Sequence, residues 1–230
     1  MTGTYLALIP ARGGSKGVPR KNLEVVGSQS LVERAVLSGH GSRMISACYV
    51  SSDDKEILAK AVELGAHAHL RSELAAADGA RASEVLVDFL ACHAEIDDEV
   101  KIVYLQPTSP FRTLAHVEQA INELESVSID ALVGVVRSHQ LPEKTLKIND
   151  SGVLALGPAG VDPGQNRQDL TASVYPNGAI YIFSVGLFRE RGEIPVIGAY
   201  PFLMGKVDSL DIDDPEDLIL ARGVAANAGI

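Results

Sequence analysis

Short apolar runs alternate with stretches of helical periodicity along most of this chain, and this alternation constrains the fold more than any other feature. Strands separated by helices of this length are typical of right-handed βαβ units. Such units build an α/β, doubly wound, mostly parallel sheet with helices on both faces. The predicted strands cover residues 5–9, 47–51, 66–70, 101–105, 130–136 and 179–183. Predicted helices begin at Leu31, after Asp54, at Ser83 as N-cap, at Thr113 or Leu114, and at Pro215.

The stretch from residue 138 to 177 breaks this alternation. It is rich in Gly, Pro, Asn and Asp and has little helical periodicity. Residues 145–148 and 152–156 flank a polar turn and predict a β-hairpin. We therefore expect one domain over residues 1–230 with a small insertion at 138–177. A lone hairpin is marginal in water, so this one must pack on its parent domain or on a second chain.

The composition limits the partners. Thirty acidic residues against 20 basic ones give a net charge of −10, which repels nucleic acid and anionic lipid. No apolar run approaches the roughly 20 residues of a membrane span. The apolar start, residues 1–9, lacks a basic region and is interpreted as a strand rather than a signal peptide. Cys48 and Cys92 lack metal spacing, so we expect two buried apolar side chains in a reducing cytoplasm.

Residues 10–22, Pro-Ala-Arg-Gly-Gly-Ser-Lys-Gly-Val-Pro-Arg-Lys-Asn, follow the first predicted strand and concentrate positive charge in an acidic chain. Glycine lets backbone N–H groups approach an oxyanion closely, and lysine and arginine neutralise the charge that amides cannot. The loop is neither a Walker A nor a GxGxxG motif. A mobile glycine turn would leave its four cations, Arg12, Lys16, Arg20 and Lys21, unexplained. The loop therefore predicts a phosphate site.

Two carboxylates, Asp211 and Asp213, stand two residues apart near the end of the chain. In an extended segment such residues point to one face, where they suit an oxygen-ligated cation such as Mg²⁺. An acidic turn before the helix at Pro215 is the structural alternative. Residues 106–110, Gln-Pro-Thr-Ser-Pro, leave another strand and offer polar groups on a stiff loop, unless they form only a capped turn.

The loop at 10–22 resembles the signature of the sugar-acid cytidylyltransferases, the family of CMP-N-acylneuraminate (sialic acid) synthetases. Further segments resemble this family in the same order along nearly the whole chain. They are Ser51-Ser52-Asp53, the Arg71, Asp78 and Ser83 stretch, residues 105–112, residues 167–170, Tyr175-Pro-Asn-Gly-Ala-Ile-Tyr181 and Asp211-Ile212-Asp213. The loop at 10–22 and the Gln-Pro-Thr-Ser-Pro segment together are a specific signal.

The resemblance implies a Rossmann-like nucleotidyltransferase that uses Mg²⁺ on Asp211 and Asp213. It implies a nucleotide site for CTP made by Ala11, Arg12, Gly13, Gly14, Ser15, Lys16, Lys21, Asn22, Arg71 and Ser83. It implies a sugar site made by Gln106, Thr108, Ser109, Lys144, Arg167 and Tyr181. It also points to a homodimer in which the insertion completes the partner's sugar pocket.

The reaction expected from this resemblance is attack by the anomeric hydroxyl of a sialic-acid-like nonulosonic acid on the α-phosphate of CTP, with release of pyrophosphate. Arg12, Lys21 and the metal on Asp211 and Asp213 would neutralise phosphate charge. Legionaminic, pseudaminic or keto-deoxyoctonic acid is the alternative acceptor. A non-catalytic nucleotide sensor is the alternative of another class, although it has no need for the carboxylate pair or the Gln106 loop.

Overall fold

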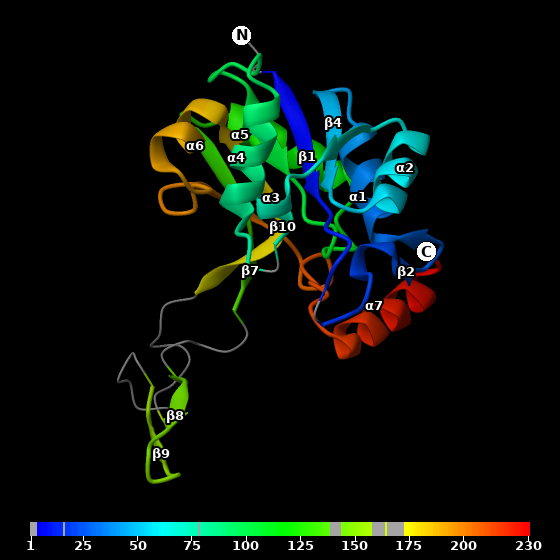
Figure 1. Cartoon of the computed structure of the whole chain (residues 1–230). Helices are drawn as coiled ribbons and strands as arrows, with labels where there is room; N and C mark the ends of the chain where they lie inside the picture. The colour runs from blue at the N-terminus through cyan, green and yellow to red at the C-terminus, as the bar shows by residue number, and fades with distance from the viewer. Residues whose placement is uncertain (1–3, 16, 78, 139–143, 158–163, 165–172) are drawn as a thin grey trace.

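A computed structural model describes residues 4–15, 17–77, 79–138, 144–157, 164 and 173–230. A seven-stranded sheet runs through the molecule (Figure 1). In spatial order its strands are β11 (Tyr200–Leu203), β7 (Ala131–Arg137), β10 (Val174–Ser184), β6 (Lys101–Tyr104), β1 (Tyr5–Pro10), β4 (Ile45–Ser52) and β5 (His67–Leu70). All neighbouring pairs are parallel except those of β10, which runs antiparallel to β6 and β7. The predicted fold class is confirmed.

Helices cover both faces of the sheet. On one face, α1 (Leu31–His40), α2 (Lys55–Glu63) and α5 (Leu114–Glu125) contribute to a core with β1 and β4. On the other face, α4 (Ala82–Cys92) and α6 (Val185–Arg191) pack on β6 and β10. A third cluster joins the final helix, α7 (Pro215–Ala228), to Ile212 and to β2 (Val25–Val26), the strand that pairs with β3 (Gln29–Ser30).

Side-chain caps fix where these helices begin. Ser30, Thr113 and Asp214 close capping boxes at α1, α5 and α7, and Asp54 caps α2. Each cap satisfies backbone N–H groups that the first helical turn leaves without partners. The prediction that Ser83 caps α4 is wrong, because the N-cap is Arg81, whose backbone N–H donates to the Glu84 carboxylate.

Several short elements escaped the sequence analysis. They are the 3₁₀ turn η1 (Lys21–Leu23), β2, β3, the four-residue helix α3 (Glu73–Ala76), α6 and β11. Cys48 is buried as expected, but Cys92 is exposed at the end of α4, so that part of the prediction is wrong. No helix among the described residues is long and apolar enough to span a membrane.

The predicted hairpin is present as β8 (Leu146–Ile148) paired with β9 (Leu154–Leu156). Figure 1 shows it set well away from the seven-stranded sheet. Its apolar side chains are exposed, with Ile148 at 73% and Leu154 at 70%. The chain has already returned to the sheet at Val174, where β10 begins to pair with β7, before the expected end of the insertion at 177.

Candidate active site

One cavity of about 390 Å³ opens where the parallel strands β1, β4 and β6 end. Ligands of open α/β sheets bind at this edge, where the loops that follow the strands gather. Because β10 is antiparallel, its first half also extends beyond the end of β6 at this edge. The cavity is lined by Pro10, Arg12, Ser15, Lys21, Asn22, Arg71, Ala80, Ala82, Val85, Tyr104, Gln106, Pro107, Thr108, Asp211 and Asp213.

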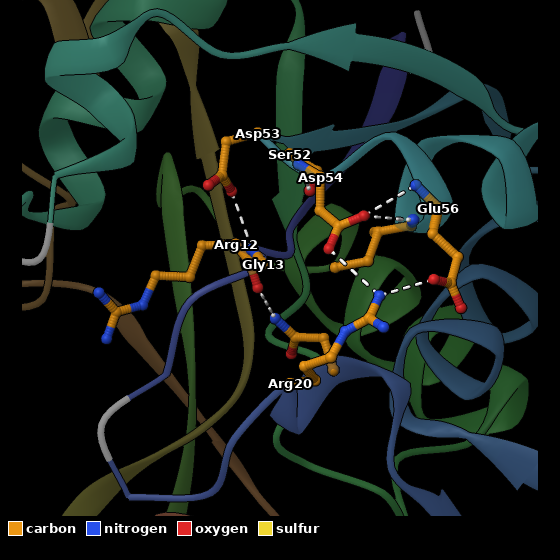
Figure 2. Close-up of polar contacts among 9 residues, drawn as sticks. Arg12, Gly13, Arg20, Ser52, Asp53, Asp54 and Glu56 are labelled. Carbon is orange, nitrogen blue, oxygen red and sulfur yellow. Dashed lines mark hydrogen bonds and ion pairs between the residues drawn. The ribbon is translucent and has the colours of Figure 1, made fainter.

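The loop at residues 10–22, which we call the glycine loop, is held by a hydrogen bond to the residue after β4 and by a hydrogen bond within the loop. The Gly13 N–H donates to the Asp53 carboxylate at 2.8 Å, and the Asn22 side-chain amide donates to the Arg12 carbonyl at 2.8 Å (Figure 2). Asn22 is buried, so its amide acts on the backbone of the loop as well as lining the cavity. These contacts fix the backbone that carries Arg12 at the mouth of the site.

Arg20 occupies a different position from Arg12. It has the left-handed backbone conformation, with φ of 53°, directly before η1. Its guanidinium donates to Glu56 at 2.7 Å and to Asp54 at 3.4 Å. Figure 2 shows the Arg12 and Arg20 side chains extending in opposite directions. The cationic cluster of the sequence is therefore divided between the cavity and the start of α2.

Lys21 joins the glycine loop to the segment that carries the carboxylates. Its ammonium donates to the Ile212 carbonyl at 2.7 Å and lies 3.5 Å from the Asp213 carboxylate. Gly17 makes the same approach with its backbone, because a Cβ there would stand 2.1 Å from the Asp213 carbonyl oxygen. Lys21 and Asp213, which are 192 residues apart in sequence, therefore bring the glycine loop and the Asp211–Asp213 segment together at the cavity.

Asp211 and Asp213 differ sharply in environment. Burial raises the pKa of Asp211, with the nearby Asp213 carboxylate adding to this, while a hydrogen bond with Thr108 and the Lys21 charge oppose it. One Asp211 oxygen is buried without a hydrogen-bond partner. The Asp213 side chain is 81% exposed. Both line the cavity, and no cluster of three or more metal-binding side chains occurs within the described ranges.

Another part of the lining consists of Arg71, Ala80, Ala82, Val85 and Tyr104, which we call the Arg71 wall. Arg71 follows β5 and is buried, its Nε donates to the Ser51 hydroxyl at 2.9 Å, and its Nη2 has no partner. Burial lowers the pKa of this guanidinium. A buried donor that lacks a partner costs free energy, so the Arg71 wall offers an unsatisfied hydrogen-bond donor to a ligand.

The residues Gln106, Pro107, Thr108 and Asp211 form a third side, the Gln106 wall. The Thr108 carbonyl accepts from the Ile212 N–H at 2.9 Å, which holds the segment of Asp211 against the loop after β6. Gly178 of β10 approaches both parts of this wall. A Cβ on Gly178 would stand 2.7 Å from the Gln106 amide oxygen and 3.7 Å from an Asp211 carboxylate oxygen.

The cavity gathers 9 of the 18 predicted site residues. Ala11 is buried, while Gly13 and Gly14 belong to the loop without lining the cavity. Ser109 is buried with its hydroxyl unpartnered, and Tyr181 packs behind Tyr104 with ring centroids 6.4 Å apart. Ser83 lines a separate cavity. Lys144 precedes the hairpin and does not line the site. Lys16 and Arg167 lie outside the described residues.

Sequence reasoning missed the apolar part of the Arg71 wall and Tyr104. Tyr104 is the last residue of β6 and directly opposes Tyr181 on β10. In the sequence it is one more residue of an apolar strand. Its position two residues before Gln106 was the one available signal, since side chains two apart on a strand share a face.

A sheet of this topology, with a cationic glycine loop after its first strand, defines a class of α/β nucleotide-binding proteins. Within this class, a family model described as cytidylyltransferase matches residues 6–154, more than half of the chain. The protein therefore belongs to the cytidylyltransferase family. This agrees with the resemblance carried by the motifs.

Curated relatives share much of the chain. It is 30% identical over 220 residues to an N-acylneuraminate cytidylyltransferase of Streptococcus agalactiae serotype V, covering 95% of this chain and 52% of the relative. It is 30% identical over 188 residues to that of Oncorhynchus mykiss, covering 81% and 42%. The chain thus spans about half the length of the curated relatives it matches.

Two solved structures share the fold. A CMP:2-keto-3-deoxy-manno-octonic acid synthetase complexed with CTP superposes with a TM-score of 0.71 at 15% identity, covering 98% of this chain and 99% of the other. A 4-diphosphocytidyl-2C-methyl-D-erythritol synthase from Anaerococcus prevotii gives 0.65 at 15% identity, covering 98% and 100%.

Proposed function

We propose that this protein transfers CMP from CTP to the anomeric hydroxyl of a sialic-acid-like nonulosonic acid and releases pyrophosphate. The observation that carries the proposal is a single cavity lined by Arg12 and Lys21 on one side and by Gln106 and Asp211 on another. The names of the curated relatives support the same reaction. The bond that forms joins the anomeric oxygen to the α-phosphorus, and the bond that breaks joins this phosphorus to the leaving pyrophosphate.

The nucleotide is proposed to bind between the glycine loop and the Arg71 wall. Arg12, Ser15 and Lys21 would hold the triphosphate, with Lys16 in the same loop, and would offset the charge that develops on the leaving pyrophosphate. The cytosine would lie on the apolar surface of Ala80, Ala82 and Val85, within reach of the unpartnered Arg71 donor. This arrangement supports a site that selects one nucleotide base, rather than a site that binds any triphosphate.

The sugar is proposed to occupy the Gln106 wall. Gln106 and Thr108 offer hydrogen bonds to hydroxyl groups from a loop that Pro107 stiffens. Holding the anomeric hydroxyl of the sugar in line with the α-phosphate converts a bimolecular step into an effectively unimolecular one. Tyr181, which pairs with Tyr104 of the Arg71 wall on the neighbouring strand, is proposed to lie beside the sugar.

Asp211 and Asp213 are proposed to hold Mg²⁺. The buried, unpartnered oxygen of Asp211 fits a hard cation that takes oxygen ligands, and the exposed Asp213 carboxylate completes a pair open to phosphate oxygens. When bound, such an ion supplies Lewis-acid stabilisation of phosphate charge. Lys21, which donates to the Ile212 carbonyl between the two aspartates, holds their segment in place.

A homodimer is part of the proposal. Leu146, Ile148, Leu154 and Leu156 are exposed on a hairpin that stands apart from the sheet, and a lone hairpin with such a surface is marginal in water. A second copy of the chain would cover it under twofold symmetry. Lys144 and Arg167 would then face the acidic end of the sugar in the partner's pocket. The cytoplasm is the proposed compartment, because the reaction consumes CTP and both cysteines are free thiols.

A substrate screen tests the reaction directly. Each of the four NTPs is combined with several nonulosonic acids, and pyrophosphate release is followed. CTP should exceed UTP clearly, because uracil presents an acceptor where cytosine presents the N4 donor and would leave buried groups unpaired. Equal rates with CTP and UTP would contradict the proposed base pocket. Tight CTP binding without pyrophosphate release for any acid would support the nucleotide sensor instead.

A further inference from the structure

Arg112 is a buried cation behind the Gln106 wall. It ends the loop that follows β6, and only 3% of its surface is exposed. Burial lowers the pKa of its guanidinium to about 9, so it stays protonated at neutral pH. Within the part of the chain that the structure describes, no carboxylate pairs with it. A buried charge without a counter-ion is costly, so an apolar side chain would serve a simple packing role better.

The guanidinium donates hydrogen bonds to three different parts of the fold. Its Nη1 donates to the Gln106 carbonyl at 2.7 Å and to the Ala179 carbonyl at 2.9 Å, and its Nε donates to the Ser38 hydroxyl at 3.1 Å. The first two partners belong to the loop after β6 and to the irregular part of β10 between Pro176 and Tyr181. A planar fork reaches such divergent acceptors together, whereas a lysine ammonium acts from one point.

The carbonyls of Gln106 and Ala179 lie on either side of a close contact between the Gln106 side chain and the backbone of Gly178. Gly178, directly before Ala179, has φ of 76° and leaves no room for a Cβ beside the Gln106 amide oxygen. Asn177 extends the arrangement, because its side chain accepts from the Ala179 N–H at 3.1 Å and donates to the Ser209 hydroxyl at 2.8 Å. Ser209 lies two residues before Asp211. The bonds of Arg112 therefore meet the backbone at the place where Gln106 and β10 touch.

We infer that Arg112 is a positioning residue that fixes the Gln106 side chain relative to Gly178 and so sets recognition of the sugar acid, an inference that rests on the proposed function. Arg112 does not line the cavity and contacts no substrate. It acts through the carbonyls of Gln106 and Ala179. Among the described residues, its hydrogen bonds go to Ser38, Gln106 and Ala179 and not to the nucleotide side of the cavity.

Steady-state kinetics of Arg112→Lys, measured separately for the sugar acid and for CTP, test this inference. The KM for the sugar acid should rise about tenfold or more, the KM for CTP should stay within about twofold, and thermal stability should fall. Ser38→Ala is the matched control, because it removes one bond of the same guanidinium on the α1 side. It should lower thermal stability and leave both KM values at the wild-type level.

A second variant keeps the test decisive if Arg112→Lys fails to fold. Gly178→Ala pushes the Gln106 amide away from the other side of the same contact, and it should also raise the KM for the sugar acid selectively. The inference is overturned if a folded Arg112→Lys, or Gly178→Ala in its place, keeps the wild-type KM for the sugar acid. It is equally overturned if either variant raises both KM values alike. A wild-type protein without transferase activity would instead refute the proposed function.

Discussion

The carboxylate of Asp211 is held in an environment that does not suit it. One of its oxygens is buried without a partner, and burial raises its pKa. Residues that lower stability in the empty protein often serve a ligand, because the ligand supplies the missing interaction. Asp213, exposed to solvent two residues later, carries no such cost. The two members of the proposed metal pair should therefore respond differently to substitution.

We predict that Asp211→Asn and Asp213→Asn each lower kcat by roughly 100-fold or more, the range for loss of a preorganised electrostatic contact. Asp211→Asn should retain or raise the thermal midpoint, because it removes a buried charge, and Asp213→Asn should leave it unchanged. Activity assays and thermal unfolding measure the two effects.

Glu216→Gln, an exposed acid at the start of α7, is the control for the aspartate variants and should keep full activity. Full turnover in excess EDTA, or near-normal turnover in both aspartate variants, would exclude the metal assignment.

Single residues were predictable where a local pattern carries the chemistry. Glycine with lysine and arginine marked the loop at 10–22, and Arg12, Ser15, Lys21 and Asn22 of this loop line the cavity; the spacing of Asp211 and Asp213 predicted a shared face for a metal, and both side chains line the same cavity. Tyr104 was not predictable in this way. An aromatic residue in an apolar strand is expected to be a core residue, and its place at the cavity depends on which strand lies beside it. Ser83 misled because a serine before an apolar helix resembles an N-cap, whereas the N-cap of α4 is Arg81, two residues earlier.

The elements followed the sequence closely wherever they were long. Apolar runs and capping residues placed β1, β4, β6, β7, α1, α2, α5 and α7 near their observed bounds. α3 and β11, with four residues each, are too short to show a period. The direction of β10 could not be predicted, because an apolar run reads the same whether the strand is parallel or antiparallel.

The loop between β1 and η1 gives the prediction at this scale. Arg12→Ala and Lys21→Ala should each lower kcat/KM for CTP by a factor that corresponds to a loss of about 2–4 kcal/mol in transition-state stabilisation, because both remove fixed charge at the cavity. Initial rates at varied CTP measure this loss.

Arg20→Ala is the matched control, since Arg20 lies in the same loop but faces Asp54 and Glu56 on the surface. Its kcat/KM should stay within about threefold of wild type, as expected for exposed ion pairs. A loss below threefold for both Arg12→Ala and Lys21→Ala would show that the loop does not hold the triphosphate.

The exposed hairpin β8–β9 sets the prediction for the whole molecule. Light scattering should give about twice the chain mass of 24.3 kDa, because twofold pairing would cover its apolar side chains. Mixing Asp211→Ala chains with Lys144→Ala chains should restore part of the activity that each lacks alone, since one site of a mixed dimer would contain neither change.

Mixing two samples of the same variant is the control for this experiment and should restore nothing. A monodisperse and fully active monomer at the assay concentration would contradict a site shared between subunits.

The cavity draws its walls from separate stretches of the chain. The glycine loop and most of the Arg71 wall come from residues before 86, and the Gln106 wall comes from residues after 105. Under the proposed function, the early stretch binds most of the CTP, whereas the later stretch binds the acceptor and also supplies the metal pair, Asp211 and Asp213. Duplicated genes could therefore diverge toward new acceptors by substitutions downstream of codon 105 that leave Asp211 and Asp213 unchanged. The phosphate chemistry would be inherited intact, and a family of this design would diversify in what it activates and not in how it does so.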